Sequence, residues 1–204
     1  METLREGLIK KLGEENLRKV QSVKIGIAGC GGLGSNLAAN LVRCGFRKLK
    51  MIDFDKVTAA NLDRQFFFSD QVGKEKAYAL KENLSRICPD LEIEAIFRKI
   101  EKDNIRWLFR DCDIVAECFD RAEYKSMLVS ELLLMGKFTV SASGLGGIGS
   151  SDDIRIHRMK ENLVVVGDLR SDVEKLPALA PRVSIAAAKQ ADVILGRIIG
   201  LSRS

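Results

Sequence analysis

The chain has 204 residues, of which 46% are hydrophobic, 6% aromatic and 30% charged, and its formal net charge is +5. This length is enough for one well-buried core but short for two complete domains, so we expect a single domain over residues 1–204. The basic residues are scattered, and this mild excess fits a nucleic-acid surface, an anionic small ligand or an acidic protein partner equally well.

The distribution of charged residues argues against secretion and against a membrane span. The first ten residues, METLREGLIK, carry charges throughout, unlike a secretory signal. The longest uncharged run, residues 25–42, contains five glycines and is too polar to cross a bilayer. No pair among the cysteines has the C-x-x-C spacing of structural zinc sites. We therefore expect a cytoplasmic protein with reduced thiols, no zinc and no membrane partner.

Hydrophobic periodicity predicts alternating helices and strands through most of the chain. Leucines at helical spacing predict an amphipathic helix or helix pair over residues 4–20. Short apolar or alternating runs predict strands at 23–29, 48–55, 91–97, 113–119 and 138–143. Helices are expected between these strands, at 33–44, 71–87, 103–111 and 122–136. This alternation predicts an α/β fold with a doubly wound, mostly parallel sheet.

The last third of the chain interrupts this alternation. The runs DIRIHRM and LVVVGDL flank the polar turn KEN and predict an antiparallel hairpin added to the parallel sheet. Apolar residues at helical spacing over 183–198 then predict a closing amphipathic helix.

A glycine-rich motif links the first predicted strand to the first helix after it. Gly29, Gly31 and Gly34 satisfy G-x-G-x-x-G, and Gly32 adds a further glycine. Such a loop lets the backbone approach a phosphate at a helix N-terminus, as in Rossmann-like folds. Asp53 follows 19 residues after Gly34, where a carboxylate can accept both ribose hydroxyls. These residues predict a nucleotide site, and alone they also fit an NAD-dependent oxidoreductase.

Three further motifs favour ATP over a dinucleotide. They are NLDRQ at 61–65, GKEKA at 73–77 and CFD at 118–120. Asp55, Arg64 and Asp120 all follow predicted strands, and the carboxyl ends of parallel strands open onto one crevice. A triphosphate needs this mixture of cations and a metal-binding carboxylate, whereas a dinucleotide pyrophosphate usually does not.

Taken in order, GCGGLGS, MIDFD, NLDRQ, GKEKA and CFD have the approximate spacing seen in the ThiF/MoeB/HesA adenylyltransferases, relatives of the ubiquitin-activating enzymes. The chain resembles this family over about residues 1–145, and its shortness is similar to the compact ThiF-like proteins of thiamine biosynthesis. The resemblance implies ATP- and Mg²⁺-dependent adenylylation of the C-terminal glycine carboxylate of a ubiquitin-like sulfur-carrier protein, which is ThiS-like and ends in Gly-Gly. It also implies release of pyrophosphate and a homodimer.

The resemblance also implies a role for each matching residue. The loop from Gly29 to Gly34 would hold the nucleotide, with Gly31 and Gly32 closest to the phosphates. The remaining implied roles are Asp53 on the ribose, Asp55 beside it, Asn61 in binding the nucleotide, Arg64 on the triphosphate, Lys76 near the α-phosphate, Asp120 on Mg²⁺, and Arg5 reaching into the neighbouring subunit's ATP site.

Several alternatives remain open on the sequence. Arg64 and Lys76 could be solvated surface charges, and Asp120 could simply cap the next helix. Arg121 stands where the family often has Asn, so a non-catalytic nucleotide sensor or scaffold is an alternative. The activated carboxylate could instead belong to a tRNA base or a peptide, although no basic stripe supports nucleic acid.

Overall fold

The computed structural model describes residues 3–172 and 175–200. The predicted N-terminal helical segment is a pair of helices, α1 (Leu4–Leu12) and α2 (Glu14–Ser22). α1 begins with a capping box, in which the Thr3 side chain accepts from the Glu6 amide and the Glu6 carboxylate accepts from the Thr3 amide. Gly13, with φ of 77°, ends α1 and lets the chain turn directly into α2.

Seven strands form one sheet in the order β3-β2-β1-β4-β5-β7-β6. Their bounds are β1 Lys24–Ala28, β2 Lys48–Asp53, β3 Glu92–Phe97, β4 Ile114–Glu117, β5 Phe138–Ala142, β6 Arg155–Lys160 and β7 Leu163–Gly167. All neighbours are parallel except β6 and β7. The predicted α/β class, doubly wound sheet and terminal hairpin are confirmed. The later strand of the hairpin, β7, is the one that pairs with β5.

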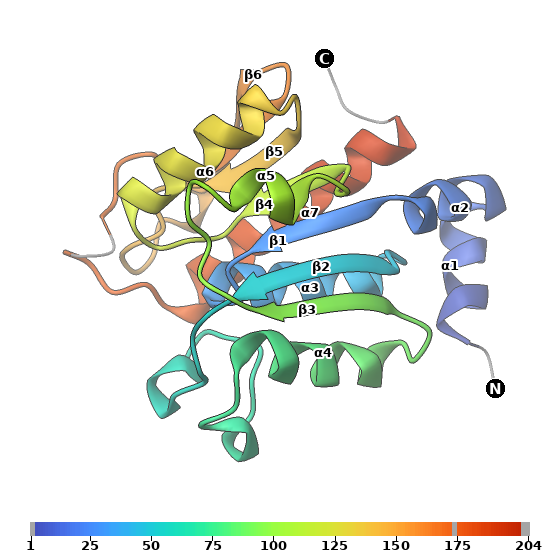
Figure 1. The fold of residues 1–204 in the computed structure, drawn as a ribbon, viewed down its shortest axis with the longest axis horizontal. Helices are drawn as coiled ribbons and strands as arrows, with labels where there is room; N and C mark the ends of the chain where they lie inside the picture. The colour runs from blue at the N-terminus through green and yellow to red at the C-terminus, as the bar shows by residue number, and fades with distance from the viewer. Residues whose placement is uncertain (1–2, 173–174, 201–204) are drawn as a thin grey trace.

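Helices cover both faces of the sheet (Figure 1). α3 (Gly32–Arg43), α4 (Lys76–Ile87) and α7 (Ala180–Ile199) share one apolar core with the sheet, while α5 (Ile105–Phe109) and α6 (Ala122–Leu134) share a second core on the other face. The predicted helix over 71–87 starts only at Lys76. The 3₁₀ turn Ser69–Gln71 and the left-handed Gly73, with φ of 92°, occupy the preceding residues. No helix among the described residues is long and apolar enough to cross a membrane.

The strand order places the topological switch point of the sheet beside β1. The chain leaves β1 for α3 on one face of the sheet and leaves β4 for α6 on the other. At such a switch point the two connections diverge and open a crevice at the carboxyl ends of the strands, where α/β folds bind their ligands. In Figure 1 these ends point to the left, and the pair α1–α2 lies at the opposite, amino ends of β1 and β2.

Candidate nucleotide-binding site

The glycine loop after β1 adopts a conformation that larger residues could not maintain. Gly29 has φ of 93°, and its amide donates to the Ile52 carbonyl at 2.9 Å. A Cβ at position 34 would overlap the Gly29 carbonyl oxygen, so the first turn of α3 can approach the loop only with glycine there. The N-cap of α3, Gly31, makes no side-chain capping bond. The backbone amides in the first turn of α3 therefore have no side-chain cap and are available to bind an anion such as a phosphate.

Asp53, predicted to hold the ribose, fixes the loop from the neighbouring strand. Its Oδ2 accepts the Cys30 amide at 2.6 Å and its Oδ1 accepts the Asp55 amide at 2.7 Å. The residue is only 8% exposed, and burial raises the pKa of its carboxyl despite these two hydrogen bonds. Each oxygen retains a second lone pair, so the proposed ribose contact is compatible with this bonding.

Lys76, predicted to lie near the α-phosphate, is held at the same edge by Asp55. Its Nζ lies 2.8 Å from Asp55 Oδ2, and its amide donates to the Asp55 carbonyl at 2.9 Å. The lysine side chain is 8% exposed and the aspartate side chain 51% exposed. A buried cation is thus tied to the end of β2 through one carboxylate that solvent can reach.

Arg64, predicted to bind the triphosphate, lies against the start of α3. A Cβ at Gly32 would be 3.6 Å from the Arg64 Cγ. The side-chain Nδ2 of Asn36 donates to the backbone carbonyls of both Arg64 and Gly32. The Arg64 Nη1 donates to Asp63 Oδ1 at 2.6 Å. The structure therefore brings Arg64 and the glycine loop together, which a freely solvated surface arginine would not require.

Asn61 has a local bonding role. Its Oδ1 accepts the Thr58 amide at 3.0 Å and closes the 3₁₀ turn Ala59–Asn61. This turn begins the segment that leads to Arg64. The predicted contact of Asn61 with the nucleotide stays a prediction.

The sequence analysis did not identify the polar residues, Ser35 and Gln65, that link residues 61–66 to the glycine loop. Ser35 Oγ donates to the Gly31 carbonyl at 2.7 Å and accepts the Phe66 amide at 3.0 Å. Gln65 Nε2 would lie 3.8 Å from a Cβ at Gly31, and the buried Gln65 Oε1 has no hydrogen-bond partner among the described residues. The signal in the sequence that could have identified Gln65 as a site residue was its position at the end of the NLDRQ motif.

Asp120, predicted to hold Mg²⁺, lies in the short loop between β4 and α6. This loop packs on the glycine loop, because a Cβ at Gly29 would be 3.2 Å from the Cys118 carbonyl oxygen and 3.3 Å from the Phe119 ring. The N-cap of α6 is Arg121, and no side chain makes a capping bond there, so the helix-capping alternative for Asp120 is wrong. The exposed Asp120 carboxylate makes no hydrogen bond or ion pair within the part of the chain that is described.

Two thiols near this crevice are buried and poorly suited to be nucleophiles. Burial raises the pKa of both Cys30 and Cys118, and the carboxylates of Asp53 and Glu117 raise them further. Cys118, which is 7% exposed directly after the end of β4, is therefore better explained as a small packing residue than as a nucleophile.

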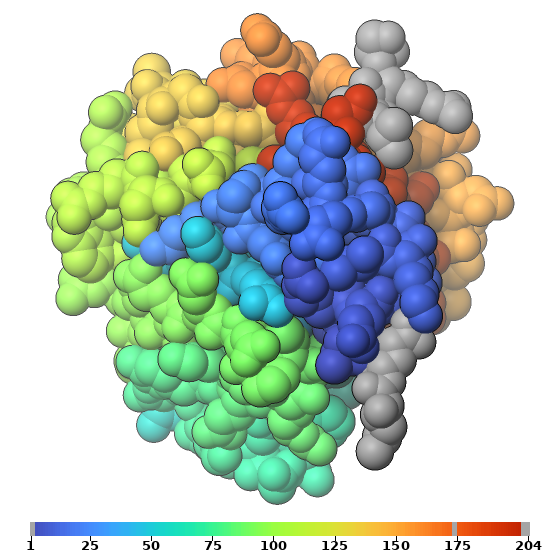
Figure 2. Space-filling view, turned by 90° about the vertical axis from the view of Figure 1, so that its right-hand side faces the viewer, coloured from blue at the N-terminus to red at the C-terminus, as the bar shows by residue number. Residues whose placement is uncertain are grey.

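Arg5 lies far from the glycine loop of its own chain. Its guanidinium binds Glu14 at 2.9 Å, and Leu8 of the same helix faces Gly45, just beyond the opposite end of α3 from the loop. Figure 2 looks onto this amino-end face, where the N-terminal helices are drawn in blue. Any contact of Arg5 with nucleotide therefore requires a second subunit.

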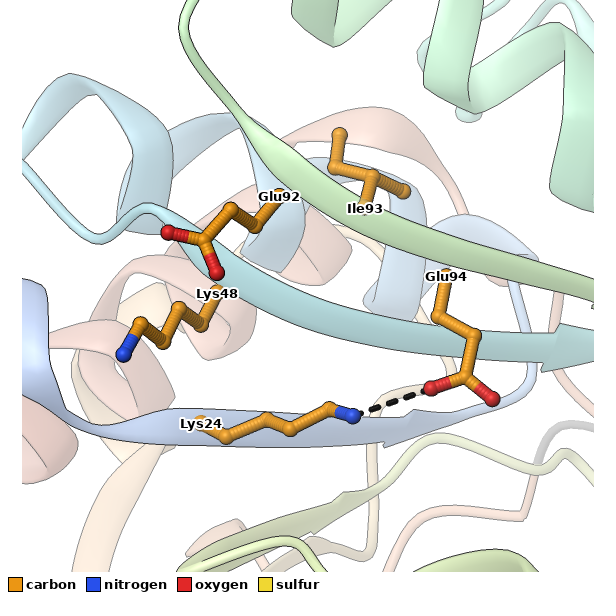
Figure 3. Close-up of a pocket in the computed structure, with 5 residues that line it drawn as sticks. All are labelled: Lys24, Lys48, Glu92, Ile93 and Glu94. Atoms are coloured by element: carbon orange, nitrogen blue, oxygen red, sulfur yellow. Dashed lines mark hydrogen bonds and ion pairs between the residues drawn. The ribbon is translucent and has the colours of Figure 1, made fainter.

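A surface hollow at the other end of the strands lies away from the glycine loop. It measures about 340 Å³ and lies at the amino ends of β1, β2 and β3, lined by Lys24, Lys48, Glu92, Ile93 and Glu94 (Figure 3). Lys24 spans it to Glu94 at 2.9 Å. Its paired charges and its distance from the glycine loop separate it from the nucleotide site.

Comparison with known proteins decides the family. The model of the ThiF family matches residues 4–188. The chain belongs to the ThiF family. This confirms the resemblance drawn from the five motifs, and it leaves the NAD-dependent oxidoreductase alternative without support.

Curated relatives of this ThiF-family chain include a modifier-activating enzyme and an adenylyltransferase. Ubiquitin-like modifier-activating enzyme 5 of Dictyostelium discoideum is 34% identical over 142 residues, covering 63% of the chain and 37% of that protein. Adenylyltransferase and sulfurtransferase MOCS3 of Mus musculus is 32% identical, covering 69% of the chain and 31% of that protein. The chain thus spans about a third of the length of these relatives.

Solved structures share the fold of this ThiF-family chain. The E. coli tRNA N6-threonylcarbamoyladenosine dehydratase TcdA, in complex with AMP, is 20% identical with a TM-score of 0.87, covering 96% of this chain and 94% of that one. E. coli MccB with ATP is 21% identical with a TM-score of 0.74, covering 92% of this chain and 59% of that one.

Proposed function

We propose that this chain is an adenylyltransferase that uses ATP and Mg²⁺ to activate a carboxylate. The observation that carries the proposal is the packing of the Arg64 side-chain stem, its Cγ and Cδ, over Gly32, which puts the arginine of NLDRQ within reach of a phosphate at the glycine loop. Lys76 and Asp120 follow β2 and β4, the two strands that flank β1, and so border the same crevice. Names and titles of relatives that refer to adenylyl transfer, ATP and AMP support this chemistry.

The reaction joins two anions, so its catalysis is mainly electrostatic. A carboxylate oxygen attacks the α-phosphorus of ATP, the bond to the β-phosphate oxygen breaks, and pyrophosphate leaves with the electron pair. No general base is needed, because the carboxylate nucleophile is already ionised. Arg64 and Lys76 neutralise the negative charge that spreads over the transferring group, and the glycine loop positions it.

The residues present fit a magnesium ion carried in with the nucleotide. No group of three or more His, Cys, Asp or Glu that could hold a metal occurs within residues 3–172 and 175–200. Mg²⁺ in nucleotide enzymes is commonly bound by one or two carboxylates together with substrate phosphates, and it then neutralises phosphate charge. Asp120, exposed and unbonded in the loop that packs on the glycine loop through Cys118 and Phe119, is the carboxylate that would hold it.

The acceptor we propose is the C-terminal glycine of a ubiquitin-like sulfur-carrier protein of the ThiS type, in thiamine or related sulfur-cofactor biosynthesis. Relatives named as activating ubiquitin-like modifiers, and as combining adenylyltransferase with sulfurtransferase activity, support this class of acceptor. A homodimer, in which Arg5 completes the partner's site, belongs to the same proposal.

ATP–pyrophosphate exchange tests this acceptor. Exchange of labelled pyrophosphate into ATP should depend on a carrier that ends in Gly-Gly and should be absent with a carrier that lacks those two residues. Equal exchange with both carriers would refute the proposed acceptor.

A second candidate acceptor is a carboxylate on a tRNA base. A structure that shares the fold over 96% of this chain is that of TcdA, a tRNA N6-threonylcarbamoyladenosine dehydratase, and its name supports this acceptor. ATP consumption that requires threonylcarbamoyl-modified tRNA, and that a Gly-Gly carrier does not stimulate, would favour this acceptor.

A further inference from the structure

A fully buried carboxylate stands at the end of β4, directly before the loop that carries Asp120. Glu117 is 0% exposed, and its Oε1 accepts the Phe119 amide at 2.7 Å. Lys125, at the end of the first turn of α6, donates to both Glu117 oxygens at 3.1 and 3.0 Å. Ser141 on β5 donates to Oε2 at 2.6 Å. One side chain therefore ties the loop, the following helix and the next strand together.

The same device occurs on the other side of β1. Asp53 is the last residue of β2 and Glu117 is the last residue of β4, and these two strands flank β1. Each acid accepts the backbone amide two residues further on, Asp55 for one and Phe119 for the other. Two buried acids thus shape the two loops that border the glycine loop.

The contact between Lys125 and Glu117 anchors the uncapped start of α6. Helix α6 starts without a side-chain cap, and its N-cap is Arg121, so its first turn has no local anchor at the end nearest Asp120. The bidentate bond from Lys125 to Glu117 holds that turn against β4. The loop between them is only four residues long, and it is fixed at Phe119 on one side and through Lys125 on the other.

We propose that Glu117, with Lys125 and Ser141, is a positioning residue that holds the Asp120 carboxylate where metal-bound triphosphate meets the protein. The inference rests on the proposed function for the role of Asp120. Nothing in the amino-acid pattern assigns Glu117 this part, because a glutamate at the end of an apolar strand is compatible with many roles.

Nucleotide binding measured by calorimetry tests the proposal. The readout is the ratio of the ATP dissociation constants measured in EDTA and in excess Mg²⁺, which reports only the contribution of the metal. Glu117→Gln keeps the shape and an acceptor for the Phe119 amide but releases Lys125. We expect the ratio to fall at least tenfold, while the affinity for AMP in EDTA changes less than twofold.

A matched control separates positioning from general stability. Asp111→Asn weakens other carboxylate–lysine contacts, those with Lys24 and Lys50 at 2.6 Å each, on the amino side of the sheet. It should lower the melting temperature and leave the Mg²⁺ ratio unchanged. If Glu117→Gln behaves in the same way, Glu117 is only structural and the proposal is overturned.

A second variant covers the case in which Glu117→Gln does not fold. Breaking one partner of a buried ion pair is costly, whereas replacing both is often tolerated. The double variant Glu117→Gln with Lys125→Met should therefore fold and still show a ratio of ATP dissociation constants that is at least tenfold below that of the unmodified protein. An unchanged ratio would refute the inference.

A separate outcome distinguishes this inference from the proposed function. If the unmodified protein shows Mg²⁺-dependent ATP binding that these variants lose, yet exchanges pyrophosphate with no acceptor, the positioning role stands and the proposed function fails.

Discussion

The Asp53 Oδ2 and the Cys30 amide nitrogen lie 2.6 Å apart, so the residue expected to contact the ribose also holds the glycine loop. Asp53→Asn can present only one oxygen to the two amides that the carboxylate now accepts. We expect a loss of stability of about 1.5–3 kcal/mol, the usual range for hydrogen bonds to charged groups. The affinity for AMP should fall at least tenfold in calorimetry. A destabilised variant with unchanged AMP affinity would limit Asp53 to a structural role.

Two glycines of one loop should respond differently to the same substitution. Gly34→Ala would place a methyl group onto the Gly29 carbonyl oxygen. We expect it to lower the free energy of unfolding by about 1–3 kcal/mol or more, the range typical of overpacking. Gly31 has φ of −77°, and a Cβ there meets nothing nearer than Gln65 Nε2 at 3.8 Å, so Gly31→Ala should change stability by about 0.5 kcal/mol or less.

Nucleotide binding then separates the two glycine variants. The methyl group of Gly31→Ala occupies space that a phosphate would approach, so AMP affinity should fall at least tenfold although the fold is intact. Thermal denaturation and AMP titration of the same samples check both effects. Tight AMP binding by Gly31→Ala would contradict the placement of the phosphates at this turn.

The two cations at the crevice should affect turnover more than folding. Arg64→Ala and Lys76→Met each remove a charge that would stabilise the transferring phosphate, and we expect each to lower pyrophosphate exchange at least a hundredfold. Arg64 is 30% exposed in its side chain and pairs with the exposed Asp63, so its loss should cost less than about 1 kcal/mol of stability. An Arg64→Ala protein that exchanges at the normal rate would refute its role.

Much of the fold and part of the site followed from the sequence. Alternating apolar runs predicted every strand of the parallel sheet, and the glycine spacing located the loop. The start of α4 at Lys76 was missed, although the polar residues of the 3₁₀ turn Ser69–Gln71 and Gly73 are signals of a break in the helix. The Glu117–Lys125 pair was missed as well. Its partners lie on different elements, and their proximity depends on tertiary packing that no periodicity encodes.

The charge cluster at the amino ends of the strands predicts a pH dependence of stability. Burial opposes the shift, but hydrogen bonds from Lys24 and Lys50 hold the pKa of Asp111 below its ordinary 3.8, and the same lysines lower that of Glu94 below 4.5. Acids with lowered pKa values contribute stability above their unfolded-state values and lose it as the pH falls. The melting temperature should therefore decline below about pH 4.5.

Asp111→Asn isolates this contribution. The Asp111 side chain is 42% exposed, so screening limits its expected contribution to about 1 kcal/mol at pH 7. The difference in unfolding free energy between Asp111→Asn and the unmodified protein should shrink as the pH falls from 4 to 2. A difference that stays constant over this range would contradict the assignment.

Arg5 provides a test of the proposed dimer, because it lies beyond the end of α3 furthest from the glycine loop of its own chain. If Arg5 acts in the partner's site, Arg5→Ala and Arg64→Ala should each be inactive alone. In a mixed dimer the Arg5→Ala subunit keeps its own Arg64 and receives Arg5 from the other subunit, so one of the two sites is complete. Mixing the two inactive variants and allowing the subunits to exchange should then restore pyrophosphate exchange, up to about a quarter of the normal rate for random pairing of two-fold dimers. An active Arg5→Ala protein, or no recovery on mixing although mass spectrometry detects mixed dimers, would exclude the role in trans.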